Sequence, residues 1–285
     1  MNNHRKWPCV CLAISKTNYC KRMDYCMITR KLCWWITEKC NENCKYCFRS
    51  LDSINNFTFE EHMEILKKII SFGTEQITWS GGEALLVPHA TELIKYAKEN
   101  GIYNKITTNG KLLTPEKIEE LKPYVDLVAL SIDSFNDDTN ISLGRGIEHR
   151  KTVLDRIQHL MNEGVKVDIN TVVVKQNIND LDEMGSFLRE NPISGKWKLM
   201  TFFPVREKAL ANKDQLEISD DAFLSEVHRL IQKYSDVNIM YMMNDQIQQH
   251  YPGVRDNGDL LVTRNFEDII LGNMTGEILK NPFLM

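Results

Sequence analysis

Beyond residue 47 the sequence contains no cysteine. All eight cysteines lie in the first 47 of its 285 residues. A disulfide framework would distribute its cysteines through the fold, so this distribution argues against a disulfide-stapled secreted domain. Crowding near one end instead favours metal chemistry.

Long apolar runs and an excess of basic charge are also missing. No apolar run approaches the ~20 residues that a membrane-spanning helix needs, and the N-terminus lacks the apolar stretch of a signal peptide. The net charge of −4 argues against general binding of nucleic acid, although it is compatible with a local basic pocket. We therefore expect a cytoplasmic protein that binds neither membranes nor nucleic acid.

From residue 31 onward, strand-like and helix-like segments alternate, and six strand–helix units are expected. The strands are expected at 31–37, 75–80, 105–108, 125–133, 165–174 and 196–203, and the helices at 59–72, 90–101, 114–121, 148–163, 179–190 and 219–234. This alternation predicts an α/β fold with a parallel sheet, either open and doubly wound or closed as a barrel. Near the C-terminus, residues 260–263 and 268–272 are expected to pair as antiparallel edge strands.

The unusual residues follow the expected strands. A cysteine loop comes after the first strand, and polar or glycine-containing segments lie at 80–83, 108–110 and 131–134. In both candidate architectures the active site lies at the C-terminal ends of parallel strands. These segments are therefore expected to meet in one site.

Three cysteines, Cys40, Cys44 and Cys47, stand in the stretch CNENCKYCF. A structural zinc site takes four ligands, and no fourth Cys or His lies nearby, so zinc is the weaker alternative. Three thiolates on a four-iron cluster leave one iron open. The incomplete set predicts a cluster whose open iron binds a small molecule.

This spacing, with Tyr46 and Phe48 around the last cysteine, resembles the cluster loop of radical S-adenosylmethionine (SAM) enzymes. The segment Ser80–Glu83 resembles the glycine-rich SAM motif of that superfamily. The resemblance covers about residues 30–205. It implies a partial (β/α)6 barrel, a 4Fe-4S cluster, cleavage of SAM to a 5′-deoxyadenosyl radical, and a flavodoxin- or ferredoxin-type reductant. It implies SAM contacts from Phe48, Ser80, Gly81, Gly82, Glu83 and Asn109.

A second stretch, residues 128–146, resembles the corresponding segment of viperin and its anti-phage relatives. In that family the positions of Ser131 and Arg145 help hold SAM. The resemblance implies a lyase that removes water from a nucleoside triphosphate and yields a 3′-deoxy-3′,4′-didehydro nucleotide, an antiviral chain terminator. The alternative is a radical SAM modification of another small metabolite, sugar or peptide. From a different class, an electron carrier or sensor would have no use for the SAM motif.

The expected nucleotide pocket departs from the family pattern. Asn170 and Lys198 match family positions that touch base or phosphate, and Lys196 replaces an arginine. Three positions lose the family residue: Gln76 and Asp168 stand where basic residues are expected, and Cys33 replaces an asparagine. Asp168 would repel a triphosphate. Either other basic residues such as Arg206 and Lys208 hold the phosphates, or the substrate is not a triphosphate and Asp168 receives a hydroxyl or amine.

The remaining expectations concern organisation and packing. Residues 1–26 are expected to be a disordered or non-native leader and 27–285 a radical SAM domain; a second metal site at Cys9, Cys11, Cys20 and Cys26 is the alternative. Trp34, Trp35 and Trp79 are expected in the core or around the cluster. Period two on the first strand places Cys33 and Trp35 on one face. No histidine pair has ligand-like spacing, so the histidines are expected to be surface or packing residues. No residue is assigned as catalytic.

Overall fold

The computed structural model describes residues 30–49, 55–248 and 252–276. The expectations for residues 1–26 and for the four cysteines they contain lie outside these ranges. Among the described residues, no helix is long and apolar enough to cross a membrane.

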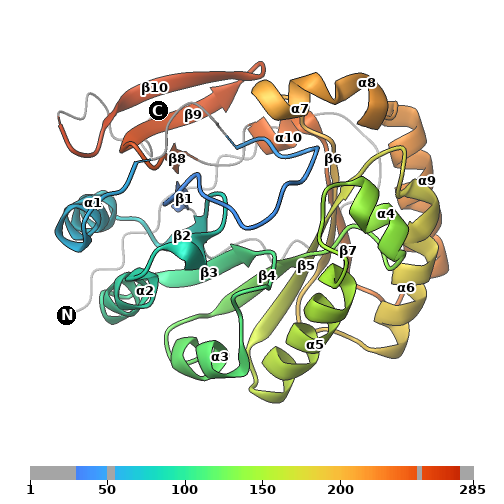
Figure 1. The fold of residues 1–285 in the computed structure, drawn as a ribbon, viewed down its shortest axis with the longest axis horizontal. Helices are drawn as coiled ribbons and strands as arrows, with labels where there is room; N and C mark the ends of the chain where they lie inside the picture. Colours follow the sequence, from blue (N-terminus) through green and yellow to red (C-terminus); the bar gives the residue numbers. More distant parts are fainter. Residues whose placement is uncertain (1–29, 50–54, 249–251, 277–285) are drawn as a thin grey trace, which may run out of the picture.

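A ten-stranded sheet forms the centre of the fold (Figure 1). Its order is β10-β9-β8-β1-β2-β3-β4-β5-β6-β7. Neighbouring strands from β1 to β7 are parallel, and β8 joins β1 in parallel, whereas β9 and β10 pair antiparallel. The strands are β1 Lys31–Trp35, β2 Gln76–Ser80, β3 Tyr103–Thr108, β4 Leu127–Ser131, β5 Lys166–Val173, β6 Trp197–Thr201, β7 Ile239–Met242, β8 Gly253–Val254, β9 Asp259–Arg264 and β10 Glu267–Asn273.

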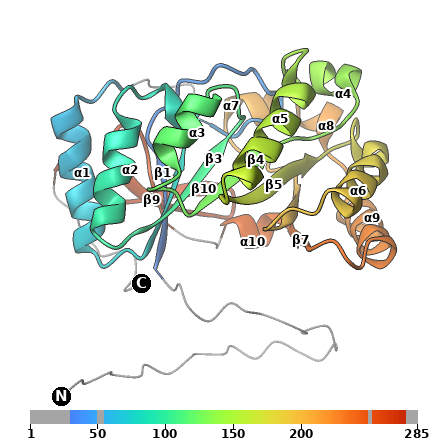
Figure 2. The same ribbon diagram turned by 90° about the horizontal axis from the view of Figure 1, so that it is seen from below.

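The longer helices stand along the outer side of the curved sheet (Figures 1 and 2). They are α1 Phe59–Ser71, α2 Ala90–Glu99, α3 Pro115–Leu121, α5 His149–Asn162, α6 Leu181–Glu190 and α9 Asp220–Lys233. Shorter elements occupy the connections: η1 Ala84–Leu86, α4 Asp137–Ser142, η2 Ile178–Asp180, α7 Glu207–Ala211, α8 Lys213–Leu216 and α10 Asn244–Gln248. The predicted α/β fold with a parallel sheet is confirmed, and so is the predicted antiparallel pair β9–β10.

Local sequence signals explain where the helices begin. Thr58 caps α1 in a reciprocal capping box with Glu61, and Thr114 caps α3, whose first residue is Pro115. Ser219 accepts the Ala222 N–H at the start of α9. These caps satisfy backbone donors that the helices cannot pair internally.

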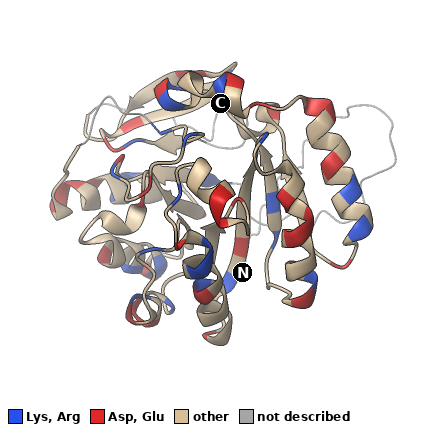
Figure 3. Cartoon of the chain, turned by 45° about the vertical axis from the view of Figure 1, so that its right-hand side comes forward, with Lys and Arg blue, Asp and Glu red and all other residues tan. Residues whose placement is uncertain are grey.

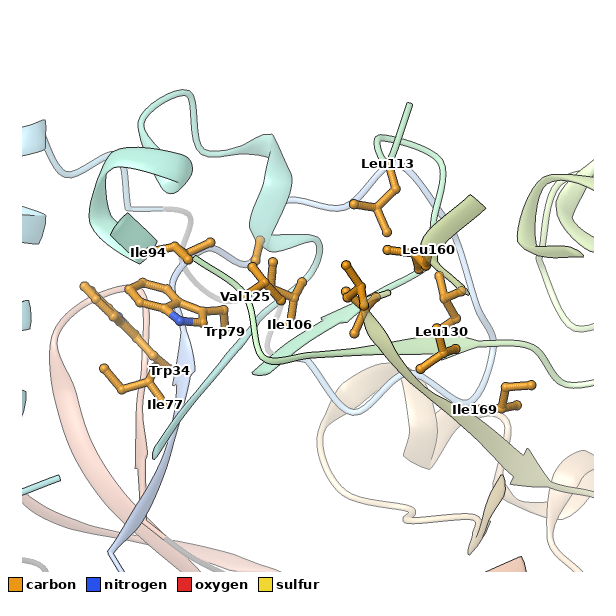
Figure 4. Close-up of a cluster of buried hydrophobic side chains, with 14 of the residues drawn as sticks. Trp34, Ile77, Trp79, Ile94, Ile106, Leu113, Val125, Leu130, Leu160 and Ile169 are labelled. Carbon is orange, nitrogen blue, oxygen red and sulfur yellow. The ribbon is translucent and has the colours of Figure 1, made fainter. Parts of the chain in front are cut away.

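The main core lies between the sheet and the outer helices. Alternate strand residues such as Trp34, Trp79 and Ile106 point into it and are fully buried (Figure 4). The Trp79 indole N–H donates to Asn104 Oδ1 at 2.9 Å, so its polar group is satisfied. The opposite strand face, which carries Cys33 and Trp35, points into the barrel interior, as period two predicts.

Two histidines meet between α1 and α2 as packing residues. His62 of α1 and His89 before α2 are 27 residues apart in sequence, yet His62 Nδ1 lies 2.7 Å from His89 Nε2. Trp34 and Phe57 pack edge-on against the His62 ring. Burial, followed by the proximity of His89, lowers the pKa of His62 to about 4. The pair therefore holds neutral imidazoles that stabilise the α1–α2 contact.

This pair predicts a loss of stability in mild acid. In the unfolded chain His62 becomes protonated below about pH 6.5, whereas in the folded protein it becomes protonated only near pH 4. Between these pH values the proton binds only to the unfolded chain, so the free energy of unfolding decreases as the pH falls. We expect His62→Gln to remove about 2 kcal/mol of the acid sensitivity between pH 6.5 and pH 5. Urea unfolding at both pH values measures this. His228→Gln, at an exposed position, is the control, and equal acid sensitivity in both variants would contradict the prediction.

Candidate active site

The cysteine loop, residues 36–48, leaves the C-terminal end of β1 and crosses the ends of the central strands (Figure 1). Its backbone pairs with the segment after α4: the Asn43 N–H donates to Gly144 O at 3.3 Å and the Lys45 N–H donates to Leu143 O at 2.9 Å. The Cys47 N–H donates to Cys44 O at 3.3 Å, which closes a turn. The loop is therefore fixed by main-chain contacts.

Two glycines at the end of β2 lie directly against this loop. The Gly82 N–H donates to Thr37 O at 2.6 Å, and the Glu83 N–H donates to Lys39 O at 2.8 Å. A Cβ on Gly81 would collide with Thr37 O, and a Cβ on Gly82 would collide with Lys39 O. The missing side chains thus let the predicted SAM motif and the cysteine loop pack backbone to backbone.

Gly144 makes the same kind of contact from the other side. Its φ is +87°, and a Cβ there would collide with Asn43 O. Because this φ is left-handed, a side chain would be strained as well as obstructed. The cysteine loop is therefore held between two glycine-containing segments, one after β2 and one after α4.

A cavity of about 310 Å³ opens beneath the loop, within the size range of small-molecule sites. Nearly all strands contribute side chains to it. Of the residues predicted to bind a cluster, SAM or substrate, these line it: Cys33, Cys40, Cys44, Cys47, Phe48, Ser80, Gly81, Gly82, Asn109, Ser131, Arg145, Asn170 and Lys198. The structure therefore brings together predicted site residues as far apart in the sequence as Cys33 and Lys198.

The three loop cysteines are suited to a cluster. All three are free thiols that line the cavity. Burial raises the pKa of Cys40 and raises that of Cys44 to about 11, so these thiols need bound metal to become thiolates. No three Cys, His, Asp or Glu side chains of the described residues converge on a single metal ion. A four-iron cluster is larger than a single metal ion and takes one thiolate on each iron. The three loop cysteines can therefore each bind a different iron of such a cluster.

Glu83 connects the ends of β2 and β3. Its carboxylate accepts from Thr108 Oγ1 at 2.9 Å, from the Asn109 N–H at 3.0 Å and from the Leu85 N–H at 3.3 Å. Burial raises the pKa of Glu83, and these donors oppose the rise. The Asn109 amide in turn donates to Asn41 Oδ1 of the cysteine loop at 2.7 Å. Glu83 is 1% exposed, and it does not line the cavity in the described part of the chain.

A buried charged network fixes the cysteine loop from the side of β4. Asp133 accepts from Arg145 Nη2 at 3.0 Å and from the Tyr46 hydroxyl. Burial would raise the pKa of Glu42, but His149, Lys111 and Arg145 outweigh it and lower that pKa to about 2. Glu42 is therefore a carboxylate next to the cysteines.

Ser131 and Phe48 both line the cavity. The Ser131 carbonyl accepts from the His149 ring at 2.9 Å, which leaves its side chain on the cavity face. The Phe48 ring packs edge-on against Trp35 and Phe203, with centroid distances of 6.4 and 6.3 Å. These aromatic rings form an apolar wall beside the cysteines.

The residues predicted to bind substrate divide into two groups. Cys33, Asn170 and Lys198 line the cavity, and Asn170 Oδ1 is a buried acceptor without a hydrogen-bond partner in the described residues. Burial raises the pKa of Cys33 to about 12, which keeps it a neutral thiol. Gln76, Asp168 and Lys196 are not among the described residues that line the cavity. Gln76 instead donates to Thr78 Oγ1 at 3.4 Å.

The residues proposed as substitute phosphate ligands have other partners. Arg206 forms an ion pair with Asp268 of β10 at 2.7 Å and donates to Phe48 O at 2.6 Å. Lys208 donates to Asn43 Oδ1. Arg206 borders the cavity, but both side chains chiefly hold the cysteine loop in place.

Sequence reasoning missed Lys105. This β3 residue lines the cavity and forms an ion pair with Asp168, Nζ to Oδ2, at 3.0 Å. A usable signal was present, because a central strand of a parallel sheet is buried on both faces and rarely carries a lysine. Asp168 is therefore paired in the folded protein, whereas the sequence alone suggested an unpaired charge.

Residues 35–188 match the radical SAM superfamily. A nucleotide dehydratase dependent on S-adenosylmethionine from Lacinutrix mariniflava is 31% identical over 260 residues, which are 85% of this chain and 53% of that protein. The chain thus spans about half the length of this relative. A protein of the same name from Flammeovirga pacifica is 31% identical over 226 residues, 73% of this chain and 77% of its own.

Solved structures show the same architecture. The crystal structure of Streptococcus suis SuiB bound to S-adenosylmethionine aligns with a TM-score of 0.66 at 19% identity, covering 82% of this chain and 60% of that one. At this identity the likeness concerns the fold. It agrees with the curved parallel sheet and the outer helices described above.

Proposed function

The chain belongs to the radical SAM superfamily, and from this premise we propose that it is a SAM-dependent dehydratase of a nucleoside triphosphate. The cluster ligands in this proposal are Cys40, Cys44 and Cys47. The product is the 3′-deoxy-3′,4′-didehydro nucleotide. Because such a nucleotide lacks the 3′-hydroxyl that a polymerase extends, the proposed role is antiviral or anti-phage defence.

One observation carries the proposal. A single cavity contains three thiols at its loop end and two lysines, Lys105 and Lys198, on its strand wall. Thiolates hold an iron–sulfur cluster, and ammonium groups bind phosphate. The names of the similar dehydratases give further support.

Each part of the chain has a distinct task in this proposal. Ser80, Asn109, Ser131 and Arg145 border the space next to the cysteines and would position SAM there. Glu83 holds Asn109 through its backbone N–H at 3.0 Å, so it would act by fixing the ends of β2 and β3. Phe48, Trp35 and Phe203 would exclude water from the reacting atoms.

The bound cluster and SAM would together supply a 5′-deoxyadenosyl radical that removes the ribose 4′-hydrogen. A flavodoxin- or ferredoxin-type reductant in the cytoplasm would supply two electrons per turnover. One would serve SAM cleavage, and the other would reduce the nucleotide after its 4′-hydrogen atom has gone to 5′-deoxyadenosine and its 3′-hydroxyl has left as water with a solvent proton. Loss of the 4′-hydrogen and the 3′-hydroxyl from the nucleotide amounts to loss of water, so the nucleotide itself is neither oxidised nor reduced overall.

The test is anaerobic reconstitution with iron, sulfide, SAM and dithionite, followed by incubation with each nucleoside triphosphate. We expect one triphosphate to stimulate formation of 5′-deoxyadenosine at least tenfold and to lose the mass of water. With a 4′-deuterated nucleotide, deuterium should appear in 5′-deoxyadenosine. The matching 3′-deoxynucleotide is the control, because it presents the 4′-hydrogen but has no hydroxyl to lose.

The outcomes separate the reaction class from the substrate. If SAM cleavage is slow and insensitive to every triphosphate, the nucleotide proposal is wrong and a metabolite, sugar or peptide substrate replaces it. If the 3′-deoxynucleotide also loses the mass of water, the hydroxyl that leaves is not the 3′-hydroxyl and this part of the proposal is wrong.

A further inference from the structure

Lys105 forms an ion pair in the barrel interior with Asp168, whose carboxylate is itself held by a second contact. Its side chain is 12% exposed and its ammonium lies 3.0 Å from Asp168 Oδ2. The other Asp168 oxygen accepts the Lys196 N–H at 2.9 Å, which ties the carboxylate to the start of β6. Asp168 is 6% exposed. The ion pair is therefore a fixed feature of the interior and not a surface contact.

The ion pair reaches across one strand. Lys105 is in register with Leu127 of β4, and Asp168 is in register with Ala129 of the same strand. Adjacent strands are about 4.8 Å apart, so β3 and β5 are separated by about twice that distance. The small side chain of Ala129, which is fully buried, leaves room for the lysine to reach across β4.

Positive charge exceeds negative charge around this pair. Lys198 lines the same cavity, and its ammonium has no hydrogen bond or ion pair within the described residues. Burial, then Lys105, and further Lys196 and Lys31 lower the pKa of Lys198 to about 7, against the opposing effect of Asp168. Figure 3 shows that Lys and Arg also occur on strands, away from the mixed charges of the outer helices. Buried like charges of this kind are stabilised by an anion.

The distance of the two lysines from the cysteine end of the cavity suits the separation between the ribose and the phosphate chain of a nucleotide. Lys105 precedes Thr107 by two residues on β3, and Lys198 precedes Met200 by two on β6; all four line the cavity. Two residues of a strand span about 7 Å, so the lysines lie one layer of side chains below the end that carries the cysteines. A ribose near that end would place its phosphate chain within reach of the lysines.

We propose that Lys105, held in place by Asp168, binds the phosphate chain of the substrate together with Lys198. This rests on the proposed function, and it assigns the phosphate contact to β3 and β6. Asp168 is then a positioning residue: both of its oxygens already have donors, so it neither binds a sugar hydroxyl nor repels the ligand as an unpaired charge would.

The test is calorimetric binding of inorganic tripolyphosphate to the reconstituted full-length protein under anaerobic conditions. This probe has the phosphate chain without base or ribose, so its binding does not depend on turnover. We expect Lys105→Met and Lys198→Met each to weaken tripolyphosphate binding at least tenfold while SAM binding stays within twofold. Lys105→Arg, which retains the charge, should recover most of the affinity. Lys98→Met is the matched control, because Lys98 forms a Lys–Asp pair with Asp126 on the surface.

The double variant Lys105→Met, Asp168→Asn distinguishes a ligand from a mere counterion. If Lys105 binds phosphate, the double variant stays as weak as Lys105→Met. If removing the Asp168 charge restores tripolyphosphate binding, Lys105 only neutralises Asp168 and the proposal is wrong. Unfolding measurements on each variant establish that the protein is folded; should Lys105→Met be unfolded, the comparison of Lys105→Arg and Lys198→Met with Lys98→Met decides.

Failure of this inference can be told apart from failure of the proposed reaction. Lysine-dependent tripolyphosphate binding without any dehydrated nucleotide would support the phosphate site and reject the reaction. A dehydrated nucleotide formed by Lys105→Met with unchanged KM would support the reaction and reject Lys105 as a phosphate ligand.

Discussion

Cys44→Ala is expected to lose the iron–sulfur cluster and with it all detectable SAM cleavage. Cys44 supplies one of the three thiols in the fixed cysteine loop. Apart from these three, Cys33 is the one described cysteine that lines the cavity. Two protein ligands would leave two irons of a 4Fe-4S cluster without a thiolate. Iron and sulfide content after reconstitution measures the loss directly, and 5′-deoxyadenosine production measures its consequence.

Cys33→Ala is the matched control. Cys33 and Cys44 are both 8% exposed and both border the cavity, so the two substitutions remove similar buried volume. Cys33 belongs to β1, on the strand wall of the cavity, and lies outside the loop that carries Cys40, Cys44 and Cys47. We expect Cys33→Ala to retain the full iron content. Retained cluster in Cys44→Ala, or equal loss in both variants, would show that the assigned ligand set is wrong.

Gly82→Ala is expected to reduce SAM binding more than tenfold and to lower the cluster content. The new Cβ would collide with Lys39 O and would also crowd Glu38 O. Both are backbone atoms, so relief requires the cysteine loop to move away from the end of β2. That movement breaks the hydrogen bonds from the Gly82 N–H to Thr37 O and from the Glu83 N–H to Lys39 O. Equilibrium binding of SAM and iron content measure the effect.

Gly101→Ala separates this collision from ordinary strain. Gly101 has a φ of +79°, and a Cβ added there would meet no described atom within 4 Å. Its substitution should cost about 1 kcal/mol in unfolding free energy through the left-handed backbone and leave SAM binding unchanged. Wild-type SAM binding in Gly82→Ala would mean that the backbone contact is dispensable for the site.

Local sequence signals predict those parts of the fold that depend on local rules. The apolar segments that form β1 to β6 and the caps at Thr58, Thr114 and Ser219 are properties of short stretches of sequence. In contrast, β7 is four residues long and β8 only two. Such strands exist because β6 and β1 offer open edges to them, and no local pattern carries that information.

The same distinction applies to the candidate site. The cysteine loop and the segment Ser80–Glu83 are compact motifs, so their meeting could be predicted from the order of the strands. The pairing of Lys105 with Asp168 depends on the register of β3, β4 and β5 and on the small residue at Ala129. Charge alone therefore could not show that Asp168 is paired, because its partner is 63 residues earlier in the chain.

The pairing of β8 with β1 has a consequence for biosynthesis. The Cys33 N–H donates to Pro252 O at 2.9 Å, and Gly253 is in register with Cys33. A ribosome delivers β1 first among the described strands and delivers β8 to β10 last. While β2 to β7 are being synthesised, one edge of β1 therefore has no partner strand next to the cysteine loop. The pairing of β8 with this edge comes late and joins segments that are far apart in the sequence. Until then, that side of the nascent barrel is uncovered next to the loop that would hold the proposed cluster.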